Sequence, residues 1–181
     1  MSDIVLLSGS PSINSGSEIL LDVSSFLLKK KDYHTSKIAV TDIPWDDLYY
    51  GQSNSPTIDS IIKEITGAKG MVISSPVYNA SYTGLLKLLI DVLPRNAFHQ
   101  KAVLPVMTGG SPAHLLALEY SLKPLIAVLK GESLGGVYVT DSQIDKQKEY
   151  PITDQDIFER LDRQVNLLHE SIQKKAERYR E

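Results

Sequence analysis

Small polar side chains cluster directly after the first apolar run of the chain, and their chemistry suits an anion. Residues 4–7 are apolar, and the hydroxyls that follow belong to Ser10, Ser12, Ser15 and Ser17. A helical pattern begins near Glu18. The first amides of a helix lack partners inside it, and the helix dipole favours negative charge there. This stretch predicts a loop that binds a phosphate monoester; the alternative is a plain strand-to-helix turn capped by Ser15 or Ser17.

Composition and missing motifs exclude several other chemistries. The loop has neither the spacing of a dinucleotide fingerprint nor the Gly-Lys-Ser/Thr of a nucleoside triphosphate loop. A net charge of -3 argues against a nucleic-acid binder, and the absence of cysteine excludes disulfides, thiol catalysis and thiolate metal sites. No metal site is expected, because the histidines lack ligand spacing: they are His34, His99, His114 and His169.

Two more loops of small and polar residues follow later apolar runs. Residues 75–82 come after the apolar run at 71–73, and residues 108–112 come after the run at 102–106. Loops that follow buried parallel strands lie at the carboxyl edge of a sheet, where α/β proteins bind their ligands. The pattern therefore predicts three ligand-binding loops in one chain.

The elements that must position these loops alternate along the chain. Apolar residues at helical spacing predict helices over about 18–31, 56–66, 83–93 and 113–130, and a last helix that begins at 153–156. Short apolar runs predict strands at 4–7, 34–40, 70–74, 102–106 and 136–139. Residues 42–55 are expected to form a loop, and Ser55 with Pro56 is a good helix start. Pro105 predicts an edge position or an irregularity in the fourth strand.

Five strands that alternate with helices predict a single α/β domain over residues 1–181. The expected architecture is a doubly wound parallel sheet with helices on both faces. In the flavodoxin-like strand order, 2-1-3-4-5, the three strands that precede the three loops are neighbours, so one ligand can touch all three loops. No apolar run reaches membrane-spanning length and no basic segment precedes the first strand, so we expect a cytoplasmic protein.

A family resemblance rests on four segments that are specific in combination. They are Gly9-Ser10-Pro11 with Ser15 and Ser17; Pro76-Val77-Tyr78 with Tyr82-Thr83-Gly84 and Leu86-Lys87; Leu104-Pro105 with Thr108-Gly109-Gly110; and Ala113-His114-Leu115-Leu116-Ala117 with Tyr120, Leu122-Lys123-Pro124 and Asp141-Ser142-Gln143. In these segments the chain resembles the NAD(P)H-dependent FMN reductases of flavodoxin-like fold. The resemblance covers nearly the whole chain and is closest to the reductases of two-component alkanesulfonate monooxygenases.

The resemblance implies that FMN binds across the three loops and that NAD(P)H reduces it by hydride transfer. The first loop would hold the phosphate, the second would follow the ring and ribityl chain, and the third would donate to the polar edge of the ring. The implied FMN contacts are Ser8, Ser10, Ser12, Ser15, Gly16, Ser17, Pro76, Val77, Tyr78, Asn79, Thr108, Gly109, Gly110 and Ser111. Since the flavin carries the reactivity, no catalytic acid or base is expected.

The phosphate loop departs from the family at one position. Many relatives carry Arg shortly after the Gly-Ser pair, where this chain has Ser12, and Glu18 lies nearby. A bidentate cationic contact to the phosphate is therefore missing. We expect FMN to bind through hydroxyls and backbone amides, so weakly that it leaves as a product.

The helix over 113–130 is expected to have two roles. Its apolar residues cover more than one face, which predicts packing on the sheet and on another subunit, in a homodimer or homotetramer. Pro124 cannot donate to the carbonyl of Tyr120, so a single π-turn is expected there. The resemblance implies a Tyr-centred π-helix at a subunit interface, and we expect Tyr120 to control flavin retention. The alternative is a packed aromatic beside a proline kink.

Other functions remain open for the same loops. The leading hypothesis is an NAD(P)H:FMN oxidoreductase that supplies reduced flavin to a monooxygenase in sulfur metabolism. A second is a quinone or azo-compound reductase with tightly bound FMN, and a third is a non-enzymatic flavodoxin-like electron carrier. The sequence does not separate NADH from NADPH as the electron donor, because no cationic pocket for a 2′-phosphate is evident in it.

Overall fold

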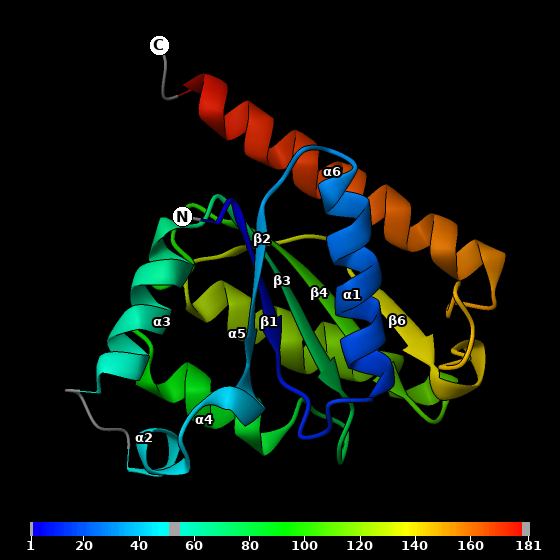
Figure 1. Cartoon of the computed structure of the whole chain (residues 1–181), viewed down its shortest axis with the longest axis horizontal. Coiled ribbons are helices and arrows are strands. Elements are labelled where there is room, and N and C mark those ends of the chain that lie inside the picture. Colours follow the sequence, from blue (N-terminus) through cyan, green and yellow to red (C-terminus); the bar gives the residue numbers. More distant parts are fainter. Residues whose placement is uncertain (1, 51–54, 179–181) are drawn as a thin grey trace.

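A parallel sheet forms the centre of the molecule, which a computed structural model describes over residues 2–50 and 55–178 (Figure 1). The strands are β1 (Ile4–Ser8), β2 (Thr35–Ala39), β3 (Gly70–Pro76), β4 (Ala102–Gly109), β5 (Glu132–Ser133) and β6 (Val137–Thr140). Their order is β2-β1-β3-β4-β5, with β6 also paired to β4. The predicted flavodoxin-like order is thus confirmed, with the fifth strand position divided between two short segments.

Pro105 lies opposite the gap between those two segments. β4 pairs with β5 through Ala102 and Val103 and with β6 from Val106 onward, so no strand pairs with the outer side of Pro105. The amide of Leu134 donates to the carbonyl of Val103. The backbone groups of odd-numbered β4 residues therefore face β5 and β6, on the side away from β3. Proline lacks an amide proton, and here it stands where the ladder is interrupted. The predicted irregularity is confirmed, although β4 is not an edge strand.

Helices cover both faces of the sheet, because alternate residues of each strand point to opposite sides. Val5, Met71 and Val103 pack with α3 (Pro56–Gly67), α4 (Gly84–Val92) and α5 (Lys123–Val128). Ile4 and Val72 pack on the other face with α1 (Gly16–Lys29) and α6 (Gln155–Arg178). Figure 1 shows these two layers on either side of the sheet. Among the described residues, no helix is both long and apolar enough to cross a membrane.

Helix starts follow the expected local chemistry. Ser55 accepts from the Ile58 amide and Pro56 occupies the first turn of α3, as the sequence predicts. Asp154 directly precedes α6, and its carboxylate accepts from the backbone amides of Asp156 and Ile157. Side chains at helical spacing then bury one stripe of α6, namely Ile157, Leu161, Val165, Leu168 and Ile172.

Two segments differ from the expected elements. The sequence predicts a loop over residues 42–55, of which 51–54 lie outside the described residues. The described part instead forms a 3-10 turn, η1 (Val40–Asp42), and a short helix, α2 (Trp45–Tyr49). Trp45 and Tyr49 are one helical turn apart, and their rings stack with centroids 5.5 Å apart.

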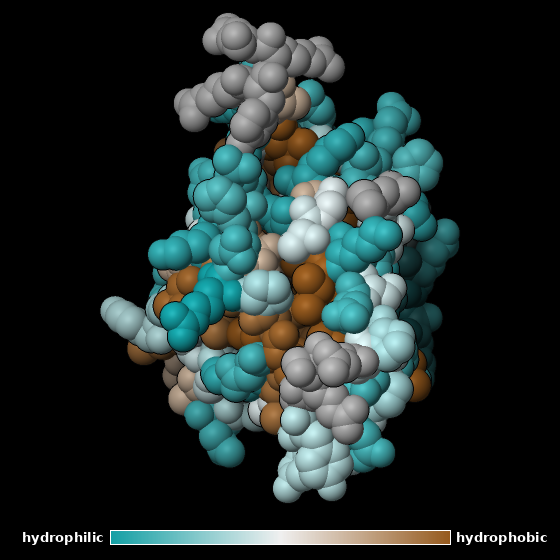
Figure 2. Space-filling model, turned by 90° about the vertical axis from the view of Figure 1, so that its left-hand side faces the viewer, coloured by the Kyte–Doolittle hydropathy of each residue, from teal (hydrophilic) through white to brown (hydrophobic). Residues whose placement is uncertain are grey.

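An open groove of about 510 Å³ lies between α2, α3 and α4. Figure 2 faces this side of the molecule and shows apolar surface flanked by polar side chains.

The single helix expected over 113–130 is a succession of three helix types. A 3-10 turn, η2 (Pro112–Leu115), is followed by a π-helix, η3 (Leu118–Leu122), and then by α5. The amide of Lys123 donates to the carbonyl of Leu118, five residues back. Pro124 has no amide proton to donate within an α-helical ladder, and the wider turn before it changes the hydrogen-bond register there. The predicted π-turn is confirmed. Tyr120 lies within it and is 79% exposed.

Candidate functional site

The phosphate loop forms between β1 and α1, and its serines cap the helix. Ser15 is the N-cap residue, and its hydroxyl accepts from the Glu18 amide. Gly16 and Ser17 follow as the first helical residues, whose amides have no partners inside the helix. The predicted cap is therefore confirmed, and it leaves two backbone donors and the positive end of the α1 dipole at the carboxyl edge of the sheet.

The predicted serines divide into those that bond within the protein and those that face outward. Ser8 is fully buried and donates to the Glu18 carboxylate, and the buried Ser10 hydroxyl donates to the Ser12 carbonyl. Ser12 is exposed, and the half-buried Ser15 hydroxyl lies 2.9 Å from that of Ser17. A phosphate at this loop would meet Ser12, Ser15 and the amides of α1, whereas Ser8 and Ser10 shape the loop from inside.

Glu18 lies in the first turn of α1 but points its charge into the protein. Its carboxylate is 5% exposed and forms an ion pair with Lys37 of β2 in addition to the hydrogen bond from Ser8. Burial lowers the pKa of Lys37, but the hydrogen bond and charge of Glu18 outweigh that effect and hold the pKa above its usual value. The pair neutralises a carboxylate that would otherwise repel a phosphate.

The second loop is a tight hairpin at the end of β3. The backbones of Tyr78 and Ser81 exchange two hydrogen bonds of 2.9 and 3.1 Å around Asn79 and Ala80. Both central residues have positive φ, 48° and 63°, which is the pattern of a type I′ turn. Asparagine tolerates this conformation better than alanine does, so the turn stores strain where it presents Tyr78 and Asn79 to solvent.

Backbone hydrogen bonds join the three loops to one another. The Gly9 amide donates to the Ser74 carbonyl, and the Thr83 hydroxyl donates to the Gly9 carbonyl, which ties the first loop to the second. The Val77 amide donates to the Thr108 carbonyl at 2.7 Å, which ties the second loop to the third. The three loops therefore converge at one edge, as the strand order predicts.

A hydrogen bond from Tyr138 of β6 anchors the third loop. The Tyr138 hydroxyl donates to the Ser111 carbonyl at 2.6 Å, and burial, with the nearby Asp141, raises the pKa of Tyr138. Gly109 is buried, and a side chain there would lie 2.6 Å from the Tyr138 hydroxyl and 3.2 Å from His114. Gly110 is exposed, and a Cβ at this position would have the Asp141 carboxylate as its nearest neighbour, 3.9 Å away. The backbone of Gly110 is thus the accessible part of this loop.

The glycines of the first loop serve packing rather than close approach of a ligand. A Cβ on Gly9 would lie 2.8 Å from Leu86 of α4, and one on Gly16 would lie 2.9 Å from Ile144. These contacts explain why both positions are glycine without any need for a ligand to approach them. Their missing side chains leave room for neighbouring helices and strands to close on the loop.

Two charged residues at the site were missed by sequence reasoning. The Lys146 ammonium donates to the Asn14 carbonyl at 2.6 Å and so places a cation at the rim of the phosphate loop. Asp141 lies beside Gly16 and Gly110, between the first and third loops. Both belong to the segment after β6. No local signal could have placed Lys146, since 132 positions separate it from its partner.

No metal cluster complements this site within the described part of the chain. His114 lies beside Gly109 and is exposed, while the other histidines lie elsewhere. The arrangement offers backbone amides, hydroxyls and one cation to an anion, next to an open rim at Tyr78 and Gly110 that can receive a flat ring. These groups fit a phosphorylated flavin.

Comparison with known proteins agrees with this geometry. The family model described as NADPH-dependent FMN reductase matches residues 2–146. The chain is 41% identical to an FMN reductase (NADPH) of Pseudomonas putida over 142 residues, which is 78% of this chain and 72% of that protein. It is 37% identical to an FMN reductase (NADPH) of Escherichia coli over 88% of this chain and 84% of that protein.

Solved structures give the same result. The structure described as NADH:FMN oxidoreductase (EMOB), apo form, superposes with a TM-score of 0.85 and 32% identity, over 94% of this chain and 90% of that one. A flavodoxin from the domain Archaea shares the fold alone, with a TM-score of 0.61 at 9% identity.

Proposed function

The chain belongs to the NADPH-dependent FMN reductase family, as an NAD(P)H:FMN oxidoreductase, and we propose that its three converging loops hold FMN while NAD(P)H reduces it. The observation that supports this site is the chain of backbone hydrogen bonds that links the loops after β1, β3 and β4. FMN supplies the redox chemistry when bound, because its ring accepts the hydride of the nicotinamide.

The first loop provides the phosphate site in this proposal. Two α1 amides, at Gly16 and Ser17, and the hydroxyls of Ser12 and Ser15 donate to the phosphate oxygens. Lys146 adds a cation at the rim, in the role that an arginine after the Gly-Ser pair would fill. One exposed ammonium is weaker than a bidentate guanidinium, so FMN is expected to exchange as a substrate.

The other two loops orient the ring. Pro76, Val77, Tyr78 and Asn79 would lie along one side of it. The exposed backbone of Gly110 would face its polar edge, and the buried Thr108 and Gly109, with Ser111, would hold Gly110 in place. Fixed amides aimed at this edge stabilise negative charge there without an acid or base. Tyr138 holds the Ser111 carbonyl and so fixes the loop in position.

The physiological role proposed for the enzyme is to supply reduced FMN to a partner monooxygenase of the alkanesulfonate type. The weak retention expected of a phosphate loop without arginine would suit this role, because an enzyme that supplies reduced flavin must release it. The π-helix with its exposed Tyr120 lies in a stretch whose apolar side chains Leu115, Leu116 and Val128 are also exposed. We place a subunit interface there, in a dimer or tetramer, with Tyr120 controlling flavin retention.

Steady-state oxidation of NADPH and NADH by the purified protein tests the proposal, with FMN, FAD, riboflavin and a quinone as separate acceptors. Turnover that requires added FMN is expected. Quinone turnover from retained flavin, without gain from added FMN, would favour a prosthetic-flavin quinone reductase. Absence of turnover with either nicotinamide would contradict the assignment as an enzyme.

A further inference from the structure

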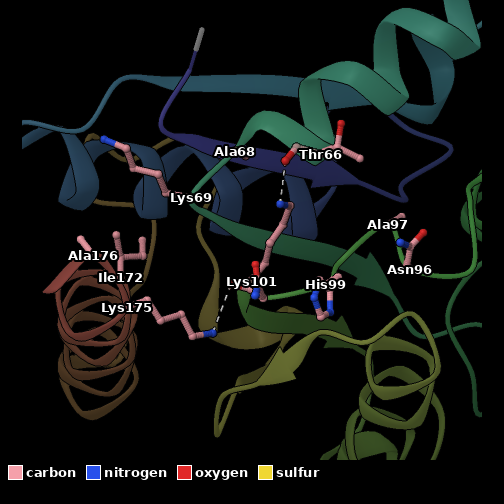
Figure 3. Close-up of a pocket in the computed structure, with 11 residues that line it drawn as sticks. Thr66, Ala68, Lys69, Asn96, Ala97, His99, Lys101, Ile172, Lys175 and Ala176 are labelled. Atoms are coloured by element: carbon pink, nitrogen blue, oxygen red, sulfur yellow. Dashed lines mark hydrogen bonds between the residues drawn. The ribbon is translucent and has the colours of Figure 1, made fainter. Parts of the chain in front are cut away.

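A separate cavity of about 450 Å³ lies at the other edge of the sheet, where β3 and β4 begin (Figure 3). Its walls are the end of α3, the turn over residues 94–101 and the last turns of α6. Because β3 is seven residues long, roughly 20 Å separate the cavity from the loop after that strand. The cavity is therefore distinct from the flavin loops.

The walls of this cavity are fixed by buried contacts. The Ala97 amide donates to the Pro94 carbonyl, and the amide of the fully buried Phe98 donates to the Leu129 carbonyl. Ile172 of α6 is 5% exposed and contacts the start of β3. A ligand would thus find a largely preformed site and would not have to order the chain.

The lining of the cavity is basic. None of the lining residues is acidic, and the polar ones include two side-chain amides, an imidazole and three ammonium groups: Asn96, Gln100, His99, Lys69, Lys101 and Lys175. A lining that carries cations and no carboxylate favours an anionic ligand, although Asp3 and Glu132 pair with two of the lysines from outside the lining.

Lys101 differs from the other two lysines in its partners. Lys69 lies 2.7 Å from Asp3 and points away from Lys101 in Figure 3, and Lys175 lies 2.8 Å from Glu132. Lys101 has no carboxylate within 4.0 Å among residues 2–50 and 55–178. It is only 7% exposed, so its charge is largely removed from water without a counter-ion.

The Lys101 ammonium donates one hydrogen bond within the described part of the chain. It donates to the Thr66 carbonyl at 2.9 Å, which uses one of its three protons. Burial and the neighbouring ammonium of Lys175 hold the pKa of Lys101 below its usual value. An anion bound beside the Lys101 ammonium would reverse both effects, since it supplies an acceptor and a negative charge.

We propose that this cavity binds a small oxyanion of the phosphate class, either inorganic phosphate or a phosphate monoester, against Lys101 and Lys175. A phosphate accepts several charge-assisted hydrogen bonds at once. His99 and Gln100, both exposed, line the same cavity and add polar groups to it. The volume exceeds that of a bare phosphate and leaves room for the organic part of a monoester.

A purely structural role for Lys101 makes a different prediction. Thr66 lies in the last turn of α3, where a lysine caps a carbonyl and complements the helix dipole. In that case Lys101→Met would lower the melting temperature equally with and without phosphate. Anion binding instead makes the melting temperature rise with phosphate, and only while Lys101 is present.

Calorimetric titration with inorganic phosphate, and separately with ribose 5-phosphate, tests the site. The protein is kept saturated with FMN so that its phosphate loop is occupied, and sodium chloride at equal ionic strength controls for screening. Lys101→Met is compared with Lys63→Gln, which removes an exposed charge of α3 outside the cavity. We expect saturable binding of at least one probe, weakened about tenfold or more by Lys101→Met and unchanged by Lys63→Gln.

The outcomes separate this proposal from the proposed function. Absence of saturable binding to the parent protein, or equal affinity in Lys101→Met, would overturn it, whatever the reductase assay shows. If Lys101→Met does not fold, Lys175→Gln decides: a several-fold weaker affinity than that of Lys63→Gln supports the site, and equal affinity rejects it. Which probe binds more tightly distinguishes free phosphate from a monoester.

Discussion

Glu18 occupies a position where a carboxylate would repel a phosphate, and its neighbours neutralise it. Lys37 pairs with it and Ser8 donates to it, so the charge is satisfied inside the protein. The positive field at the loop then comes from the α1 amides and from Lys146. A loop without arginine can bind a phosphate in this way, at the expense of affinity.

The hydroxyls of the first loop should contribute most of the phosphate affinity. Replacing both Ser12 and Ser15 by alanine removes the two proposed donors, which are each worth about 1.5–3 kcal/mol toward a charged group. The KM for FMN should rise at least about tenfold with a smaller change in kcat. The control is Ser25→Ala, which removes an α1 hydroxyl that hydrogen-bonds to Thr35 of β2. An unchanged KM in the double variant would contradict the phosphate assignment.

Lys146 should add an electrostatic contribution that depends on salt. Lys146→Gln is expected to raise the KM for FMN by about two- to fivefold at low ionic strength, with the difference shrinking as salt is added, because an exposed charge is screened. Lys148→Gln serves as the matched control, since this exposed lysine pairs with Asp145 rather than with the loop. Equal effects of the two substitutions would show that Lys146 acts only through net charge.

At the scale of single elements, the start of α6 depends on one carboxylate. The amide of Gln143, followed by the backbone amide of Ile157, holds the pKa of Asp154 below its usual value. A carboxyl with a lowered folded-state pKa stabilises the protein above its unfolded pKa, and the effect is lost as the pH falls through the folded value.

Asp154→Ala should therefore lower the melting temperature by a few degrees at neutral pH. The gap between the variant and the parent should close as the pH falls below the ordinary aspartate value of 3.8. Asp156→Ala, which removes the neighbouring carboxylate and keeps the cap, should show a smaller effect. A gap that persists unchanged in acid would mean that the cap bond is not the cause.

Tyr120 is largely exposed and lies on the π-helix, in the widened turn that precedes Pro124. If Tyr120 controls flavin retention, Tyr120→Ala should leave more FMN bound after gel filtration, measured by the visible absorbance per chain. Tyr150→Ala removes another largely exposed tyrosine and should leave retention unchanged. Equal flavin content in Tyr120→Ala and the parent would assign Tyr120 to packing alone.

At the scale of the whole molecule, exposed apolar side chains along η2, η3 and α5 predict self-association. Leu116 is 59% exposed and Val128 is 71% exposed, which is costly for an isolated chain. Replacing both by aspartate should reduce the mass measured by light scattering to that of one chain. Phe26→Asp, at a half-exposed phenylalanine on α1, should leave the oligomer intact. A parent protein that is already monomeric would contradict the interface.

The sequence by itself determined the order of elements, because strands, helices and their caps follow from local pattern. The runs at 4–7 and 70–74, the Ser55 cap and the π-turn before Pro124 each depend on neighbours a few residues away. The flavodoxin-like strand order is an expectation from the fold class, and the structure has that order, which brings the three loops together.

Tertiary structure alone decided which of the predicted groups face a ligand. Ser8 and Ser10 turn inward, Gly9 and Gly16 make room for Leu86 and Ile144, and α2 forms where a loop was expected. Lys146 reaches Asn14, and Lys101 lines one cavity with Lys175, from remote parts of the chain. Side-chain direction and long-range contact depend on how whole layers pack, and no local window of sequence contains that information.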